Sequence, residues 1–388
     1  MTRFDPEAMI AAACSQTGFD DFGGDSFREG LEIFCESAGR EAQLNQFGEM
    51  AVPGAVIGAL SNRLKIIDWA KRHPEVRNER IEAPFIVIGI FRAGTTFLSY
   101  LLEKDPSHRP LFRWETGNSI PPPTPETIAT DPRIEATRAT MAMMEQMNPR
   151  NAVVQSEEAD GPTECISVTN QDFKSVVWEA MTNVPTYGAW LKTTDHGSAY
   201  DYHKLVLQVL QSGGVRGRWS LKAPAHALTL EALHAVYPDA RMVLLHRDPV
   251  VVTTSACSLI TTLTGMFSDA DHRAYIAEHW TDMLARSIDG IDRFRAAHPD
   301  VKIADVNYAD LASDPLGTMR RVYETSGATL DGPALAAMTA HVESHPKHRF
   351  GRHGYDPAEY GLNADTIRER FKPYVDRYGI PLETFEKR

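Results

Sequence analysis

Residues 84–104 read PFIVIGIFRAGTTFLSYLLEK, and this stretch decides the fold. Its first part, Phe85 to Ile90, is an unbroken apolar run, as a strand buried on both faces of a parallel sheet should be. A loop with glycines follows, and then a helical pattern from Thr95 to Lys104. A strand, a glycine-bearing loop and a helix, in this order, offer backbone N–H groups and a helix N-terminus to an anion. The sequence therefore predicts an anion-binding loop at the end of a buried strand.

Strands and helices alternate along the rest of the chain. Arg241 to His246 is a second clear strand, followed by helical residues 250–262, and Arg218 to Leu221 and Val301 to Val306 are shorter strand candidates. Strands separated by helices form a parallel sheet with helices on both faces. We therefore expect an α/β protein with a P-loop-like three-layer fold, in which helices flank a central parallel sheet.

The first 80 residues predict helices only. Ser26 to Glu29 has the pattern of a capping box, Ser followed three residues later by Glu, which predicts a helix start at Ser26. A second helix is expected from Val56 to Arg72, where apolar residues recur every three or four positions. We expect a helical N-terminal extension over residues 1–80 and a single domain over residues 81–388.

Composition excludes several classes of protein. The 388 residues are 43% hydrophobic, which is too apolar for a disordered chain, and the net charge is −12. Such an acidic chain is a poor general binder of nucleic acid, because that binding depends on Lys and Arg at phosphates. The four cysteines lack the spacing of metal ligands, so we expect reduced thiols and no metal. No apolar run approaches the roughly 20 residues of a membrane span, and no signal peptide is evident, so we expect a cytoplasmic protein.

The loop after the first strand has a particular chemistry. Gly89 and Gly94 have the spacing of a P-loop, but Thr95 and Thr96 stand where an NTPase has Lys and Ser or Thr. A positive charge is present instead at Arg92. The loop is therefore suited to a phosphate-like group but not to Mg-ATP in the usual manner.

This Arg-x-Gly-Thr-Thr loop resembles the 5′-phosphosulfate-binding loop of sulfotransferases that use 3′-phosphoadenylyl sulfate (PAPS). The resemblance implies that Arg92 contacts the 5′-phosphosulfate, that the next residues supply backbone and hydroxyl donors, and that Phe97 stacks on adenine. The donor-binding residues expected in this loop are Arg92, Ala93, Gly94, Thr95, Thr96 and Phe97.

Three further segments resemble the same family. Arg247, at the end of the second strand, and Ser255, eight residues later, match the pair that binds the 3′-phosphate. Residues 307–311, Asn-Tyr-Ala-Asp-Leu, look like the family's segment after the last core strand, and we interpret them as packing and capping residues. Near the C-terminus, residues 349–354 resemble the family's Arg-Lys-Gly-x-x-Gly segment, with Phe350 in place of the lysine. This last match implies that Arg349, Gly351 and Arg352 close over the 3′-phosphate.

Sulfuryl transfer needs in-line attack, a base for the hydroxyl proton and cations for the leaving phosphate. Arg92 and Lys222 are the expected cations, because Lys222 resembles the family's lysine on the leaving-group side. For the base we expect Glu115, which is placed like the glutamate of tyrosylprotein sulfotransferases. The alternatives are His226, in the same Leu-Lys-x-Pro-x-His motif as Lys222, and an acid within residues 157–164, such as Glu158, Asp160 or Glu164.

The sequence thus favours a PAPS-dependent sulfotransferase that releases 3′-phosphoadenosine 5′-phosphate (PAP, also called 3′,5′-ADP). The aromatic and methionine residues between 141 and 202 suggest a small, apolar alcohol or phenol as acceptor. The competing hypotheses are a P-loop kinase or NTPase, against which the absent lysine argues, and an inert nucleotide-binding scaffold. An anionic donor is compatible with the net charge of −12 only if cations converge locally, and those expected are Arg92, Lys222, Arg247, Arg349 and Arg352.

Overall fold

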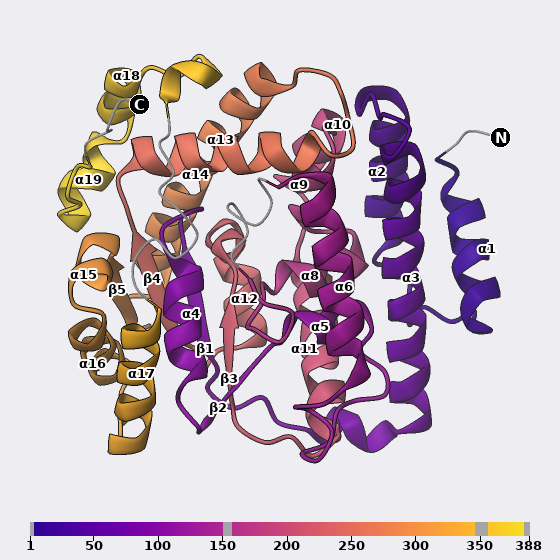
Figure 1. The fold of residues 1–388 in the computed structure, drawn as a ribbon, viewed down its shortest axis with the longest axis horizontal. Helices are drawn as coiled ribbons and strands as arrows, with labels where there is room; N and C mark the ends of the chain where they lie inside the picture. The colour runs from indigo at the N-terminus through magenta and orange to yellow at the C-terminus, as the bar shows by residue number, and fades with distance from the viewer. Residues whose placement is uncertain (1–3, 150–156, 346–355, 384–388) are drawn as a thin grey trace.

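Five parallel strands form one sheet in the order β2-β3-β1-β4-β5, in a computed structural model that describes residues 4–149, 157–345 and 356–383 (Figure 1). Val87 in the central strand pairs with Lys222 on one side and with Val243 on the other. The expected α/β fold with a central parallel sheet is confirmed. The strands are β1 (Phe85–Gly89), β2 (His108–Pro110), β3 (Arg218–Lys222), β4 (Arg241–His246) and β5 (Ile303–Asn307).

Helices cover both faces of the sheet because its strands are apolar on both sides. Ile86 and Ile88 point into one cluster of buried side chains, and Phe85 and Val87 point into another on the opposite face. The first cluster is shared with α11 (Gly197–Ser212), α12 (Leu230–Val236) and α14 (Arg273–Ala297). The second is shared with α4 (Thr95–Glu103), α13 (Pro249–Thr264), α15 (Tyr308–Ser313), α16 (Pro315–Thr325) and α17 (Gly332–Ser344).

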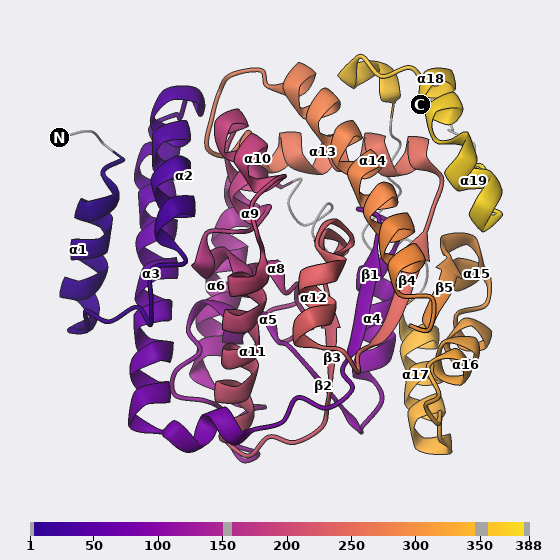
Figure 2. The same ribbon diagram turned by 180° about the vertical axis from the view of Figure 1, so that it is seen from behind.

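The helices of the first 80 residues stand side by side at one end of the molecule, opposite the helices that precede the C-terminus (Figures 1 and 2). Their apolar residues share a core with later parts of the chain, since the ring centroids of Phe34 and Trp178 are 4.8 Å apart. The helices at the first end are α1 (Pro6–Thr17), α2 (Arg28–Glu41) and α3 (Gly48–Arg72), and those at the other end are α18 (Ala364–Arg370) and α19 (Lys372–Tyr378). Between them lie α5 (Arg113–Gly117), α6 (Pro132–Met147), α8 (Ile166–Thr169), α9 (Val177–Met181) and α10 (Pro185–Leu191).

The expected capping box at Ser26 is wrong. Helix α2 begins at Arg28, and no side chain caps it. The Ser26 hydroxyl instead donates to a carboxylate oxygen of Asp172, at 2.5 Å, and Asp172 is also paired with the buried Arg63 at 2.9 Å. The oxygens of a buried carboxylate need hydrogen-bond donors, and the Ser26 hydroxyl is one of those donors for Asp172. Ser26 is therefore not available to cap a helix.

Helix α3 is longer than expected. It begins at Gly48, eight residues before Val56, and runs through Pro53. By length and composition it is the one helix in the described ranges that could cross a membrane, but 56% of its apolar stretch is buried inside the protein. Val56, Leu60 and Leu64 are fully buried in the core that α3 shares with α1 and α2. Packing within the protein therefore accounts for its apolar face.

Candidate active site

The loop between β1 and α4 turns sharply at two residues with left-handed backbone. The φ angle is 65° at Arg92 and 97° at Gly94. A Cβ atom on Gly94 would lie 2.7 Å from Cδ2 of Tyr308, so only glycine fits this position. The turn directs the chain into α4, whose first residues are Thr95 and Thr96. The first backbone N–H groups of this helix and its dipole favour an anion at the loop.

The loops after β1 and β4 meet at the carboxyl edge of the sheet. The Arg92 Nε atom donates to the Ser255 hydroxyl, at 3.1 Å, and Arg247 Nη1 donates to the carbonyl oxygen of Arg92, at 3.2 Å. Strands β1 and β4 are parallel neighbours, so residues that follow them reach the same edge. The structure therefore brings Arg92, Arg247 and Ser255 together, as the sequence predicts.

The Arg247 guanidinium has partners that the sequence did not suggest. Its Nε and Nη2 atoms donate to Oε1 and Oε2 of Glu383, at 2.7 and 2.8 Å. Its Cζ atom lies 3.8 Å from the centre of the Tyr308 ring, a cation–π contact. Tyr308 thus packs against both Gly94 and Arg247, and the interpretation of this segment as structural omitted its place beside the loop.

Lys222 ends β3 and is almost completely buried, with 1% of its side chain exposed. Its Nζ atom donates to Glu157 Oε1 at 2.6 Å and to the Thr96 hydroxyl at 3.3 Å, and it lies 3.5 Å from Glu164 Oε1. Burial alone would lower the pKa of Lys222, but the two carboxylates raise it above its ordinary value. The contact with Thr96 joins the end of β3 to the first turn of α4.

The two carboxylates beside Lys222 differ in their surroundings. Burial would raise the pKa of Glu157, but Lys222 and Arg113 lower it below its ordinary value, and the Thr163 hydroxyl also donates to this carboxylate. Glu164 is 25% exposed, and its pKa is raised by burial and by the charge of Glu157, against the opposing effect of Lys222. A carboxylate with a raised pKa is the stronger proton acceptor, so Glu164 is the more basic of the two.

Comparison with known proteins agrees with this site. Residues 84–332 match the sulfotransferase family. The crystal structure of sulfotransferase STF9 from Mycobacterium avium is similar, with a TM-score of 0.90, 34% identity and 97% of both chains covered. Sulfotransferase STF1 from Mycobacterium tuberculosis H37Rv gives a TM-score of 0.84 and 33% identity, over 95% of this chain and 98% of that one. The chain belongs to the sulfotransferase family.

Among curated relatives, the omega-hydroxy-beta-dihydromenaquinone-9 sulfotransferases Stf3 of Mycobacterium bovis and Mycobacterium tuberculosis are 23% identical over 173 residues. This match spans 43% of the chain and 42% of the length of those relatives. The similarity to STF9 and STF1 covers nearly the whole chain, so it includes helices from the first 80 residues as well as the sheet.

Glu115, the expected base of this sulfotransferase, has a different environment from the one that role requires. It is completely buried, and its oxygens accept hydrogen bonds from Arg109 at 2.5 and 2.7 Å and from the backbone N–H of Phe112 at 3.0 Å. Arg109 is itself buried, with its Cζ atom 4.3 Å from the centre of the Trp219 ring. A base must reach the acceptor hydroxyl, directly or through one water, so this geometry argues against Glu115.

His226 is also remote from a catalytic environment. Burial lowers its pKa to about 3, with a smaller effect of His203, and its Nδ1 atom lies 2.7 Å from the Tyr200 hydroxyl. Its side chain is buried on η3 (Pro224–Leu228), where it contacts Tyr200 of α11. We therefore assign His226 to packing. Phe97 is partly buried on α4, and Arg349, Gly351 and Arg352 lie outside the described residues.

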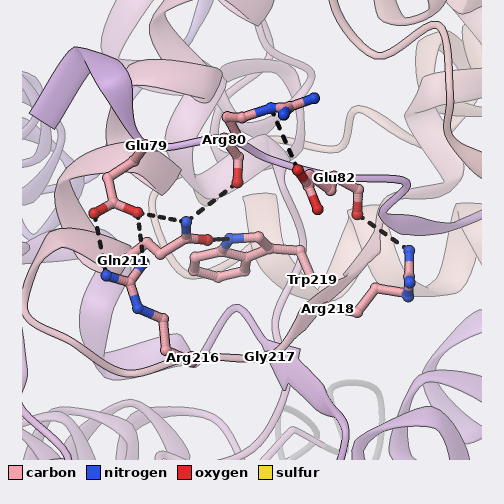
Figure 3. Close-up of a pocket in the computed structure, with 8 residues that line it drawn as sticks. All are labelled: Glu79, Arg80, Glu82, Gln211, Arg216, Gly217, Arg218 and Trp219. Atoms are coloured by element: carbon pink, nitrogen blue, oxygen red, sulfur yellow. Dashed lines mark hydrogen bonds and ion pairs between the residues drawn. The ribbon is translucent and has the colours of Figure 1, made fainter.

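A separate pocket of about 440 Å³ lies at the other end of the sheet, where residues 79–82 and 211–219 precede or join the strands (Figure 3). Its polar groups satisfy one another: Arg216 and Gln211 both donate to the Glu79 carboxylate, and Trp219 Nε1 donates to Gln211. Trp219, which lines the pocket, lies three residues before Lys222 on β3, a separation of roughly 10 Å at about 3.3 Å per residue. The pocket is therefore distinct from the candidate active site.

Proposed function

We propose that this sulfotransferase uses PAPS as its donor and transfers the sulfuryl group to the hydroxyl of a small, apolar alcohol or phenol. The observation that carries the proposal is the meeting of Arg92, Lys222 and Arg247 at the carboxyl ends of three adjacent strands. Each follows or ends a different strand, so their convergence is a property of the fold. It places three cations of an acidic protein at one edge of the sheet.

The residues present fit both anionic ends of the donor. Arg92 and the N–H groups of the turn into α4 suit the 5′-phosphosulfate, because a left-handed turn before a helix exposes successive backbone donors. Arg247 and Ser255 suit the 3′-phosphate, since a guanidinium and a hydroxyl supply several hydrogen bonds to a dianion. We also propose that Phe97 stacks on adenine and that Arg349, Gly351 and Arg352 contact the 3′-phosphate, as the family resemblance implies.

Lys222 stabilises the charge that develops on the leaving phosphate. The carboxylates beside it keep its pKa raised, so the ammonium stays protonated although it is buried. A fixed cation in a site with little water acts more strongly on developing charge than the same cation in solution. Its contact with Thr96 holds it beside the loop that binds the donor.

Glu164 is the proposed base, in place of Glu115. PAPS supplies an activated sulfuryl group. The acceptor oxygen forms a bond to sulfur while the bond from sulfur to the bridging phosphate oxygen breaks. The hydroxyl proton passes to the Glu164 carboxylate, whose pKa is raised and whose side chain is partly exposed. Glu157 is less suitable because Lys222, Arg113 and Thr163 already bind its oxygens.

The apolar acceptor is supported by the surroundings of the site. Phe91, just before Arg92, and Ile166, two residues after Glu164, are partly exposed and pack at the edge of a hydrophobic cluster. The name of the relative Stf3 specifies a hydroxylated acceptor, omega-hydroxy-beta-dihydromenaquinone-9, which agrees with a hydroxyl group as the acceptor in this proposal. We include a cytoplasmic location in the proposal, because all four cysteines are free thiols, as is usual in a reducing compartment.

Calorimetry with 3′,5′-ADP and with Mg-ATP tests the donor. We expect 3′,5′-ADP to bind without Mg²⁺ and more tightly than Mg-ATP, and we expect PAPS to sulfate apolar alcohols or phenols in a hydroxylated panel. A preference for Mg-ATP would favour a P-loop kinase or NTPase. Binding of 3′,5′-ADP without transfer to any acceptor would favour an inert scaffold. Replacing Lys222 by Met should abolish sulfuryl transfer from PAPS to every acceptor that the wild type sulfates.

A further inference from the structure

We propose that Glu383 belongs to the 3′-phosphate subsite and competes with that phosphate for Arg247. The inference rests on the proposed function, in which Arg247 binds the 3′-phosphate of the nucleotide. It identifies a residue that the sequence motifs did not indicate. The side chain comes from the segment after α19, far along the chain from the donor-binding loop.

The contact between Glu383 and Arg247 has the geometry with which arginine binds an anionic ligand. Both oxygens of Glu383 face the Nε and Nη2 edge of Arg247, at 2.7 and 2.8 Å. This paired arrangement is the one in which arginine binds a carboxylate or a phosphate. A phosphate that uses the same two donors must displace the Glu383 carboxylate, because one edge of a guanidinium holds one pair of oxygens. Both side chains are partly exposed, at 18% for Arg247 and 33% for Glu383, so a ligand can reach them.

The backbone of Glu383 is held in place independently of its side chain. Its N–H donates to Asp248 Oδ2 at 2.8 Å, and its carbonyl oxygen accepts from Arg368 at 3.3 Å. Asp248 is fully buried and caps α13 through the N–H of Val250. These backbone contacts hold Glu383 next to Arg247. Rotation about the side-chain bonds of Glu383 is enough to move its carboxylate away from the guanidinium. The exchange therefore needs no movement of a secondary structure element.

Competition of this kind has a defined consequence for the nucleotide. The Glu383 carboxylate must leave Arg247 before a 3′-phosphate binds there, and it remains close enough to repel that dianion. When the carboxylate returns to Arg247, it replaces the phosphate and favours release of 3′,5′-ADP. If Glu383 only oriented Arg247, its removal would weaken nucleotide binding, so the two roles predict changes of opposite sign.

The test is the affinity of Glu383→Gln for 3′,5′-ADP, measured by calorimetry and by stopped-flow dissociation. We expect affinity to rise about fivefold, which is the size of an exposed charge interaction, and dissociation to slow. Binding of 5′-AMP, which lacks the 3′-phosphate, should not change. Glu369→Gln is the matched control, since it removes the same charge from an exposed position on α18 and should leave both affinities as they are.

Two results would overturn the inference: weaker binding of 3′,5′-ADP by Glu383→Gln, or unchanged binding. Glu383→Ala should reproduce the sign of the effect, and melting temperatures of both variants check that each is folded. Arg247→Ala separates this inference from the proposed function. If Arg247→Ala leaves 3′,5′-ADP binding unchanged, the assignment of the 3′-phosphate fails, whatever Glu383 does. If it weakens binding, Glu383→Gln should raise the affinity for 3′,5′-ADP less in that background than in the wild type, because the competition for Arg247 is gone.

Discussion

Lys222 remains charged in a buried position because carboxylates surround its ammonium group. Glu157 is 2.6 Å from Nζ and Glu164 is 3.5 Å from it. Against the effect of burial, Lys222 and Arg113 hold the pKa of Glu157 below its ordinary value, whereas burial and the charge of Glu157 raise the pKa of Glu164 against the effect of Lys222. Two acids with different pKa values beside one cation are a common basis for dividing roles in an active site.

Glu164→Gln is therefore expected to lower kcat by about 100-fold to 10,000-fold, the range for loss of a general base, while binding of 3′,5′-ADP stays the same. The amide keeps the shape of the side chain but accepts no proton. Steady-state kinetics with an excess of PAPS, together with calorimetry, measure the two quantities separately.

Asp160→Asn is the matched control for Glu164→Gln. Asp160 lies in the same acidic segment, but its side chain is 53% exposed and lies 3.6 Å from Arg138, away from Lys222. It should keep the kcat of the wild type. The raised pKa adds a second readout, because the base must be ionised: activity should be lost on acidification at a higher pH than for an ordinary glutamate. Wild-type kcat in Glu164→Gln would exclude this residue as the base.

Glu115→Gln should act on stability and not on chemistry. The change leaves the buried Arg109 without its counter-charge, and breaking a buried ion pair costs about 3 kcal/mol or more. We expect the free energy of unfolding in urea to fall by about that amount, while the kcat of the folded enzyme is retained. The double variant Arg109→Met, Glu115→Leu removes both charges and should recover part of the loss. A folded Glu115→Gln protein without turnover would return the base role to Glu115.

At the scale of elements, the turn between β1 and α4 is where local backbone geometry and tertiary packing coincide. Gly94 has a φ of 97°, and Tyr308 occupies the space where a Cβ atom would lie. Gly94→Ala should therefore move the loop, raise the Kd for 3′,5′-ADP at least tenfold and destabilise the protein. Calorimetry and thermal denaturation measure the two effects.

Gly327→Ala separates backbone strain from contact in the loop. Gly327 also has a left-handed φ, of 63°, but no atom lies within 4 Å of the position of its Cβ. Its substitution should cost about 1 kcal/mol of stability through strain alone and leave the Kd unchanged. If both alanine variants bind 3′,5′-ADP equally well, the contact between Gly94 and Tyr308 does not shape the site.

The elements that the sequence predicted well are those whose local pattern agrees with their surroundings. β1 is apolar throughout, and β4 has four apolar residues, Met242 to Leu245, between Arg241 and His246; both strands are buried on both faces and were expected within one residue of their observed ends. β2 was missed because it has only three residues, His108 to Pro110, and its residue types are not those of a strand. Neighbouring strands decide the conformation of such a segment.

The same contrast applies to the site. The resemblance to the sulfotransferase family implied one site for Arg92, Lys222, Arg247 and Ser255, and contacts at the carboxyl edge of the sheet join Arg92 to Ser255 and Arg247, and Lys222 to Thr96. The pairing of Glu115 with Arg109, and of Glu383 with Arg247, depends on how distant segments pack, and no local spacing encodes it.

At the scale of the whole molecule, the net charge of −12 is compatible with an anionic donor because the cations are concentrated at one edge of the sheet. Lys222 is paired there with Glu157, and Arg247 with Glu383, so an anionic donor meets cations that already contact carboxylates of the same chain. Among the described residues, no group of three or more acidic, histidine or cysteine side chains could hold a metal ion.

The stability of the whole protein should depend on pH through histidines that are buried behind the site. Burial lowers the pKa of His203 and of His226 to about 3. Both histidines stay neutral in the folded state, whereas in the unfolded chain they take up a proton below a pKa of roughly 6.5. Acidification therefore favours unfolding, and each histidine should cost about 2 kcal/mol by pH 5, since one pH unit below 6.5 costs about 1.4 kcal/mol.

His203→Gln should remove its share of this dependence. Between pH 7.5 and pH 5, we expect the variant to lose about 2 kcal/mol less unfolding free energy than the wild type, as measured by urea denaturation at each pH. Tyr237→Phe is the matched control, because the Tyr237 hydroxyl lies 2.8 Å from His203 Nδ1 and its loss breaks the same hydrogen bond without removing the imidazole. That variant should be less stable at every pH but keep the wild-type slope. A wild-type slope in His203→Gln would mean that this histidine is protonated in the folded protein, against its burial in a core of aromatic and aliphatic side chains.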